Sequence, residues 1–224
     1  MTRRQLQVRE LGRLNWADSY ALQQQLVEQR KHSLISDQLL YVEHPHTVTM
    51  GRNGHASNVL ANPEMLRRAG IAYHETNRGG DVTYHGPGQI VGYTIFDLRE
   101  WKRDVMAFLR ALEQVIIDAL ADFGIESWRE PGATGVWTVQ GKICAMGVHI
   151  SRWVTSHGFA LNHTTDLSYF RYIVPCGLAK PVTSMEAFGV RAQRSDVEAA
   201  LTARLSGTFG QKVTVEELIL TETK

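Results

Sequence analysis

The sequence contains few of the features that define several large classes of protein. Its 224 residues include only two cysteines and six prolines. Two cysteines are too few for a disulfide-stapled scaffold, and they do not form the CxxC pairs of a structural zinc site. No apolar run approaches the roughly 18–20 residues that a membrane-spanning helix needs. The basic start of the chain is not followed by the apolar region of a signal peptide. We therefore expect a cytoplasmic protein with free thiols and no membrane contact.

The sequence also lacks an excess of charge of either sign. Its 24 Lys and Arg residues face 23 Asp and Glu residues, which leaves a net charge of +1. That charge is too small for a protein that holds nucleic acid through a general basic field. Hydrophobic residues make up 43%, enough for a large core. Because no repeat and no Pro/Ser-rich linker divides the chain, we expect a single domain over residues 1–224.

The hydrophobic pattern predicts antiparallel groups of strands with helices set between the groups. A long helix is expected from its N-cap Asp104 to Gly124, and a short one opens at Asn62-Pro63-Glu64. A last helix is expected at Ser195, with Glu198 completing a capping box. This arrangement favours an α+β fold with mixed, largely antiparallel sheets over a doubly wound parallel sheet. The expected strands cover 38–42, 47–50, 71–76, 81–85, 90–97, 136–139, 143–150 and 156–162.

A first stretch that could carry chemistry runs from Arg78 to Gln89 and reads Arg-Gly-Gly-Asp-Val-Thr-Tyr-His-Gly-Pro-Gly-Gln. Two glycine clusters bracket a four-residue strand that is rich in polar side chains. Glycines allow the backbone to approach a ligand closely, and their N–H groups can hold a carbonyl or an anion. The alternative is a pair of tight turns around a hairpin strand. The density of polar groups favours a binding site.

A second stretch, from Gln140 to Gly147, contains Lys142 at the tip of an expected hairpin. A lysine in that position is usually solvated. The stretch has the wrong glycine spacing for a phosphate-binding loop, and Ile143 stands where Ser or Thr must hold magnesium. The pattern therefore excludes a P-loop nucleotidase.

The two cysteines lie in different settings. Cys144 is inside an apolar strand and is expected to be a buried, inert thiol. Cys176 lies between Pro175 and Gly177, in a turn that can present its sulfur to a cleft, although a lone loop cysteine is more often incidental. The histidines do not have metal-ligand spacing, so we expect no metal site.

Three motifs, 78–89, 141–147 and the Val-Pro-Cys-Gly run 174–177, together resemble the lipoyl(octanoyl) transferases. The resemblance covers roughly residues 39–185 and includes His-Gly-Phe-Ala-Leu-Asn at 157–162. It implies the catalytic α+β fold shared with biotin and lipoate ligases. It also implies transfer of an octanoyl group from acyl carrier protein to a lipoyl-domain lysine without a cofactor. The Gly-Arg-Gly-Arg-x-Gly loop of the biotin ligases is missing.

The resemblance also implies roles for individual residues. Cys176 matches the acyl-accepting cysteine, and Lys142 matches the lysine paired with it. The implied acceptors are the lipoyl domains of 2-oxoacid dehydrogenase E2 subunits and the glycine cleavage H protein. The residues that match the family's acyl pocket are Arg78, Gly79, Gly80, Asp81, Val82, Thr83, Tyr84, His85, Ala145, Met146, Gly147, Gly158, Phe159 and Ala160.

The chemistry of these groups is consistent with that role. A cysteine is only a few per cent thiolate at neutral pH and gains from a nearby ammonium. Backbone N–H groups at Gly79, Gly80 or Gly177 could hold the tetrahedral oxyanion. Three alternatives stay open: a lipoyl amidotransferase, an ATP-dependent lipoate or biotin ligase, and a protein that only binds lipoyl domains.

Overall fold

The main sheet mixes parallel and antiparallel strands. The computed structural model describes residues 4–174 and 181–216, and within them this sheet has seven strands. β1 pairs in parallel with β10 and with β2, and every other neighbouring pair is antiparallel. In order across the sheet, the strands are β10 (Gln211–Glu216), β1 (Arg4–Arg13), β2 (Asp37–Glu43), β6 (Gln89–Ile95), β9 (Val154–Asn162), β8 (Gly141–Ser151) and β7 (Val136–Thr138).

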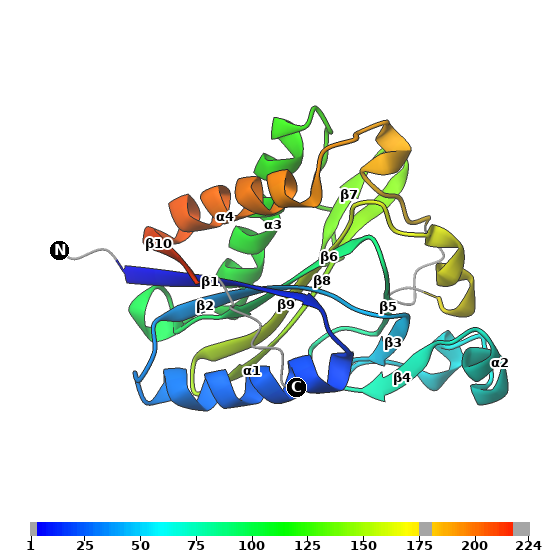
Figure 1. Ribbon diagram of the computed structural model, residues 1–224, viewed down its shortest axis with the longest axis horizontal. Coiled ribbons are helices and arrows are strands. Elements are labelled where there is room, and N and C mark those ends of the chain that lie inside the picture. The colour runs from blue at the N-terminus through cyan, green and yellow to red at the C-terminus, as the bar shows by residue number, and fades with distance from the viewer. Residues whose placement is uncertain (1–3, 175–180, 217–224) are drawn as a thin grey trace, which may run out of the picture.

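A smaller sheet lies beside one end of the main sheet (Figure 1). Its central strand, β3 (Thr47–Met50), pairs in parallel with β4 (Ala72–Glu75) and antiparallel with β5 (Val82–His85). β2 and β3 are joined by only three residues, yet they belong to different sheets. The chain therefore changes sheet at His44-Pro45-His46.

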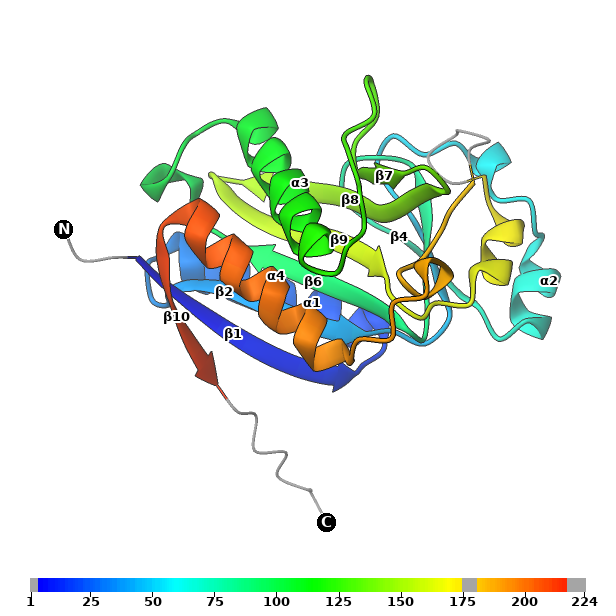
Figure 2. The ribbon, with the colours of Figure 1, turned by 90° about the horizontal axis from the view of Figure 1, so that it is seen from above.

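Helices cover both faces of the main sheet (Figures 1 and 2). α3 (Val105–Asp122) and α4 (Arg194–Phe209) pack together on one face, whereas α1 (Trp16–Lys31) covers the other face. The short α2 (Pro63–Arg68) lies beside the small sheet. Within residues 4–174 and 181–216, no helix combines the length and the apolar composition required to cross a bilayer.

The predicted helix starts at Asp104 and Asn62 are confirmed in detail. The Asp104 side chain accepts the N–H of Ala107 at 2.9 Å, and the Asn62 side chain accepts the N–H of Met65 at 2.9 Å. Each bond satisfies one of the backbone donors that a helix N-terminus leaves without an internal partner. The expected α+β class, with mixed and largely antiparallel sheets and flanking helices, is confirmed as well.

The predicted capping box of the last helix is wrong. The N-cap is Gln193, which makes no side-chain capping bond, and α4 begins at Arg194. Glu198 does not reach back to Ser195; it forms an ion pair with Arg194 at 2.7 Å. An arginine four residues before Glu198 offers its carboxylate a charged donor, which is a stronger partner than a backbone N–H.

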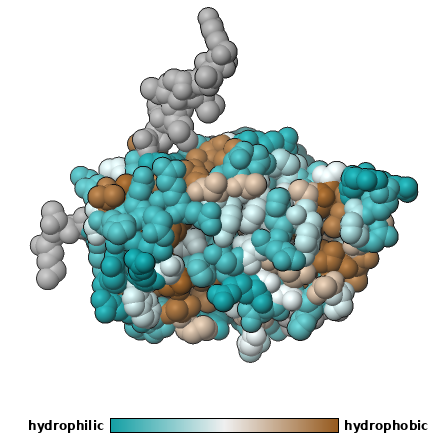
Figure 3. All heavy atoms as spheres, turned by 90° about the horizontal axis from the view of Figure 1, so that it is seen from below, coloured by the Kyte–Doolittle hydropathy of each residue, from teal (hydrophilic) through white to brown (hydrophobic). Residues whose placement is uncertain are grey.

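Three elements were not expected from the sequence: β1, α1 and β10. α1 buries polar side chains, among them Ser19, Gln23 and Arg30, so its buried face does not stand out as an apolar stripe. Arg30 is held in place by Asp37, at 2.8 Å between its Nε and the carboxylate. Figure 3, which looks onto the side of the molecule that α1 covers, shows a mostly hydrophilic surface.

Candidate active site

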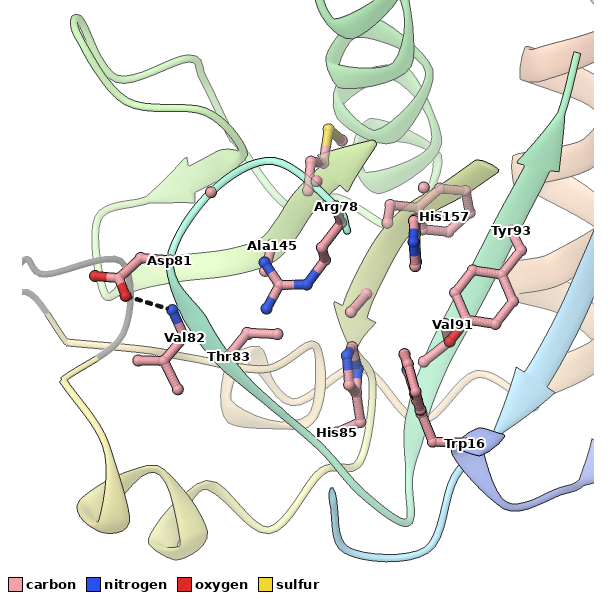
Figure 4. Close-up of a pocket in the computed structure, with 16 residues that line it drawn as sticks. Trp16, Arg78, Asp81, Val82, Thr83, His85, Val91, Tyr93, Ala145 and His157 are labelled. Atoms are coloured by element: carbon pink, nitrogen blue, oxygen red, sulfur yellow. Dashed lines mark hydrogen bonds between the residues drawn. The ribbon is translucent and has the colours of Figure 1, made fainter. Parts of the chain in front are cut away.

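A pocket lies where the small sheet faces β6, β9 and β8 of the main sheet (Figure 4). All the predicted acyl-pocket residues line it except Gly79 and Tyr84. They come from stretches far apart in the sequence, which the two sheets bring together around one space. The lining is Trp16, Arg78, Gly80, Asp81, Val82, Thr83, His85, Val91, Tyr93, Ala145, Met146, Gly147, His157, Gly158, Phe159 and Ala160.

The alternation of β5 explains why Tyr84 is elsewhere. Thr83 and His85 line the pocket, whereas Tyr84 joins the apolar core of the small sheet. Successive side chains of a strand point to opposite faces. The Tyr84 hydroxyl pairs with His46 Nδ1 at 2.7 Å, and its ring stacks on Tyr169. Burial raises the pKa of Tyr84, so the hydroxyl stays protonated.

The loop that carries Arg78 is held from two sides. Arg78 donates from its guanidinium to the Thr49 carbonyl at 2.7 Å and to the Thr49 hydroxyl at 3.0 Å. Gly79 donates its N–H to the Val148 carbonyl of β8 at 2.9 Å. That bond occupies the Gly79 donor. Of the other two oxyanion candidates, Gly80 is part of the described structure, whereas Gly177 lies outside the described residues. The Cβ of any other residue at Gly147 would lie 2.7 Å from the Gly79 carbonyl oxygen, so the loop lies directly on β8.

Asp81 is a structural member of the pocket wall. Its carboxylate accepts the N–H of Val82 at 2.7 Å and that of His55 at 3.2 Å, and it also pairs with the Asn58 amide. The backbone of Arg52 donates to the Arg78 carbonyl at 2.9 Å. These bonds join the loop around residues 51–58 to the loop around residues 78–82. Asp81 therefore shapes the wall and is engaged on both of its oxygens.

The two histidines that line the pocket are neutral. Burial is the main cause that lowers the pKa of His85 and of His157, in each case to about 3. Gln89 donates from its amide nitrogen to the Tyr84 carbonyl, so its oxygen faces His85 Nδ1, 2.9 Å away. Nδ1 of His85 therefore carries the proton. A neutral imidazole beside the Arg78 guanidinium can shape the pocket and accept a hydrogen bond, but it has no acidic proton to give at neutral pH.

Four lining residues were not among the predicted pocket residues: Trp16, Val91, Tyr93 and His157. His157 opens the 157–162 stretch that the family resemblance includes. Val91 and Tyr93 point to the same face of β6 because they are two positions apart. Trp16 begins α1 and stacks on Tyr20 and His74. The alternation in β6 could have suggested the first two, but nothing in the sequence indicates that Trp16 reaches this pocket.

Lys142 is buried, although a lysine at a hairpin tip is usually solvated. Only 5% of the residue is exposed, and its amine lies 5.2 Å from the centre of the Trp137 ring. It lines a small cavity that shares Thr83, Ala145 and Ala160 with the main pocket. The small cavity that Lys142 lines therefore adjoins the main pocket, with these three residues as common walls. The remaining lining of the small cavity is Gln89, Asn162, Phe170 and Val182.

Cys176 lies outside the described residues, and the residues on either side of the gap are anchored near the site. Val174 donates its N–H to the Asn58 carbonyl at 2.7 Å. At the other side, the Pro181 carbonyl accepts the N–H of Lys142 at 2.9 Å, and Thr183 donates back to the Lys142 carbonyl at 2.9 Å. The chain therefore re-enters the described structure directly beside Lys142.

Cys144 is fully buried in β8, as expected. Burial raises the pKa of its thiol, and the Lys142 charge opposes that effect only in part. A thiol that is held protonated is a poor nucleophile. Among the described residues, no group of three or more His, Cys, Asp or Glu side chains is placed to hold a metal ion.

The sequence of this chain is similar to those of known proteins over most of its length. Residues 15–206 match the model of the lipoyl protein ligase A/B catalytic domain. This chain belongs to that family. The octanoyltransferase of Solibacter usitatus is 61% identical over 202 residues, which cover 90% of this chain and 92% of that protein. The octanoyltransferase of Flavobacterium johnsoniae is 42% identical over 94% of this chain and 99% of its own length.

The fold of the lipoyl protein ligase A/B family is also seen in solved structures. A putative lipoate protein ligase from Thermoplasma acidophilum with bound lipoic acid has a TM-score of 0.75 and 14% identity. The alignment covers 97% of this chain and 90% of that one. The biotin protein ligase of Aquifex aeolicus aligns with a TM-score of 0.52 and 12% identity, over 92% of this chain and 69% of the ligase. At such low identity these neighbours establish the shared architecture alone, and the expected fold is confirmed.

Proposed function

We propose that this protein transfers an octanoyl group from acyl carrier protein to the lysine of a lipoyl domain, through a thioester on Cys176. The observation that carries the proposal is the position of Lys142, buried in the wall of a small cavity that shares Thr83, Ala145 and Ala160 with the main pocket. High sequence identity to proteins named octanoyltransferases supports octanoyl as the acyl group that is transferred. Five positions separate Cys176 from Pro181 (181 − 176), a reach of at most about 18 Å from Pro181, whose carbonyl accepts the Lys142 N–H.

The first step exchanges one thioester for another. The Cys176 thiolate attacks the octanoyl carbonyl, the bond to the carrier thiol breaks, and the carrier sulfur leaves with the electron pair. Thioester exchange is close to energy-neutral. In the second step the acceptor amine attacks, its proton is lost, and Cys176 leaves as thiolate. Because forming the amide is downhill, neither step needs a nucleotide.

Lys142 serves both steps in this proposal. As an ammonium it stabilises the Cys176 thiolate in the loading step. Once the acyl-enzyme has formed, that negative charge is gone, and a buried cation without its counter-charge loses its proton more readily. Lys142 can then accept the proton of the attacking amine.

The pocket suits an aliphatic chain attached near Lys142. Ala145 and Ala160 line both cavities, and Gly147 and Gly158 line the main pocket, where their lack of a side chain lets the 78–80 loop and β6 approach closely. Phe159 adds apolar surface to the wall. An eight-carbon chain that enters where the two cavities adjoin would replace water against these residues, which favours binding by roughly 0.8 kcal/mol for each buried CH₂ group.

The acceptors in this proposal are the lipoyl domains of 2-oxoacid dehydrogenase E2 subunits and the glycine cleavage H protein. We further propose that residues 1–224 form one catalytic domain that works in the cytoplasm. No cofactor takes part in the proposed reaction.

Supplying one acceptor lipoyl domain with three donors in parallel tests the proposal. The donors are octanoyl-acyl carrier protein, octanoate with ATP and magnesium, and a second lipoyl domain that already carries octanoate. We expect modification with the first donor only, and no release of AMP. Transfer only from octanoate with ATP would identify a ligase, and transfer only from the acylated domain would identify an amidotransferase. Binding of the lipoyl domain without transfer from any donor would also overturn the proposal.

A further inference from the structure

A buried carboxylate lies behind the wall against which Lys142 packs. Glu113, on α3, has no exposed surface. One of its oxygens accepts the N–H of Gly135 at 3.0 Å. The other pairs with Arg110 at 2.7 Å and with Arg129 at 3.2 Å. Glu113 therefore ties the segment that leads into β7 to the middle of a long helix.

Gly135 is in direct contact with the Lys142 side chain. A Cβ atom at this position would lie 2.6 Å from Lys142 Cε and 3.2 Å from its Nζ. The backbone of Gly135 has a φ of +123°, a conformation that residues other than glycine rarely adopt. Two residues later, the Trp137 ring lies 5.2 Å from the same amine. The segment 135–137 thus contacts the lysine amine at two points.

The charges around this contact come from several elements. Glu113 on α3 and Lys142 on β8 both act electrostatically on the Cys144 thiol between them, with opposite signs. Arg110 and Arg129 balance the Glu113 charge from the outer side; their side chains are 42% and 34% exposed. Arg110 reaches water, whereas Arg129 also donates to the Arg110 carbonyl at 2.9 Å and to the Gln114 side-chain oxygen at 2.7 Å. The bond to Gly135, by contrast, is buried.

We infer that Glu113 is a positioning residue for Lys142: by holding the Gly135 backbone, it fixes the wall that aims the lysine amine into the small cavity. The inference rests on the proposed role of Lys142. The reach of the carboxylate to Gly135 matters in this mechanism more than its charge does. A misplacement of about 1 Å in such a group can lower a rate by up to about 100-fold.

Two substitutions separate reach from charge. Glu113→Gln keeps the length and an oxygen that can accept the Gly135 N–H, while its amide nitrogen replaces the oxygen that pairs with Arg110 and Arg129. Glu113→Asp keeps the charge but draws the oxygen back from Gly135 by one methylene. Asp122→Asn is the matched control, because Asp122 is on the same helix and pairs only with the exposed Arg204 in the described structure.

The first readout needs no acyl donor: the rate of Cys176 alkylation by iodoacetamide, followed by peptide mass mapping over a range of pH. Lys142→Ala should move the midpoint up by about one pH unit or more, since the thiolate loses its cation. Glu113→Asp should move it in the same direction and lower kcat by about tenfold with little change in KM. Glu113→Gln and Asp122→Asn should stay close to the wild type.

The outcomes distinguish this inference from the proposed function. An unshifted midpoint in Lys142→Ala would contradict the pairing of Lys142 with Cys176, and thus the proposed function. A shift in Lys142→Ala, with wild-type behaviour in Glu113→Asp, would overturn only the role of Glu113. A larger effect of Glu113→Gln than of Glu113→Asp would also overturn it, since charge and not reach would then decide.

Discussion

Cys144 and Lys142 are two positions apart on β8, but the pairing of β8 with β7 shifts register between them, so the regular alternation of side chains does not hold there. Their surroundings favour opposite roles. Lys142 lines a small cavity that adjoins the pocket, whereas Cys144 is enclosed by the core that α3 and α4 cover. A thiol so close to the proposed base could be mistaken for the nucleophile. Burial of the sulfur, which raises the pKa of Cys144, argues against that reading.

Replacement of Cys144 by Ala tests this distinction. We expect Cys144→Ala to retain most octanoyl transfer, because the sulfur contributes packing and not chemistry. The variant should lose about 1 kcal/mol of stability, on the scale of one buried methylene-sized group. Steady-state transfer from octanoyl-acyl carrier protein and urea unfolding measure the two effects. A folded Cys144→Ala protein that no longer forms an acyl-enzyme would show that Cys144 is the nucleophile.

The sequence indicates some helices and strands of the fold more clearly than others. Asp104 and Asn62 precede apolar residues at helical spacing, so α3 and α2 could be located, caps included. α1 could not be located in this way, because its buried face contains polar residues. The side-chain oxygen of buried Gln23, for example, accepts the His157 N–H. The partners that make these polar residues buried are distant in sequence. Only the packed structure reveals them.

The same reasoning applies to the candidate site. Three pocket segments are contiguous motifs, and their resemblance to a family placed them together in advance. Trp16 and Tyr93 come from elements that carry no motif and meet the pocket only because α1 and β6 pack against β9. The burial of Lys142 was equally hidden, since it depends on Gly135 and on Trp137.

The contact between the 78–80 loop and β8 predicts the effect of a single methyl group. In Gly147→Ala the new Cβ would lie 2.7 Å from the Gly79 carbonyl oxygen and 3.3 Å from Arg78 Cδ, so the loop must move. We expect about tenfold slower transfer and a loss of about 1–3 kcal/mol, as for other overpacked sites. Gly207→Ala is the control: it meets nothing within 4 Å on α4 and should raise stability by about 0.5–1 kcal/mol. Transfer by Gly147→Ala at the wild-type rate would show that this loop does not shape the pocket.

At the scale of the whole molecule, buried histidines make stability depend on acid. Burial lowers the pKa of His85 and His157 to about 3 and that of His44 to about 4. In the unfolded chain each would titrate near 6.5. Below that pH these histidines bind protons in the unfolded state but not in the native state. The free energy of unfolding therefore falls as the pH drops from about 6.5 towards 4.

The expected slope is up to about 1.4 kcal/mol per pH unit for each histidine in that window. Urea unfolding between pH 4 and 8 measures it. His44→Gln removes one titrating group. Below pH 6.5 the slope of its stability against pH should therefore be smaller than that of the wild type, by up to about 1.4 kcal/mol per pH unit. Parallel curves for the two proteins would contradict the neutral state that we assign to His44.

The mass of the intact protein after reaction with octanoyl-acyl carrier protein, without any acceptor, tests the central claim most directly. The account predicts one added octanoyl group, located on Cys176 by peptide mapping, labile to hydroxylamine and lost when a lipoyl domain is added. Cys176→Ser should load poorly, because a serine hydroxyl lacks the accessible anion of a thiol at neutral pH. Transfer to the lipoyl domain at the full rate by Cys176→Ser, or an adduct on any other residue, would contradict the proposed mechanism.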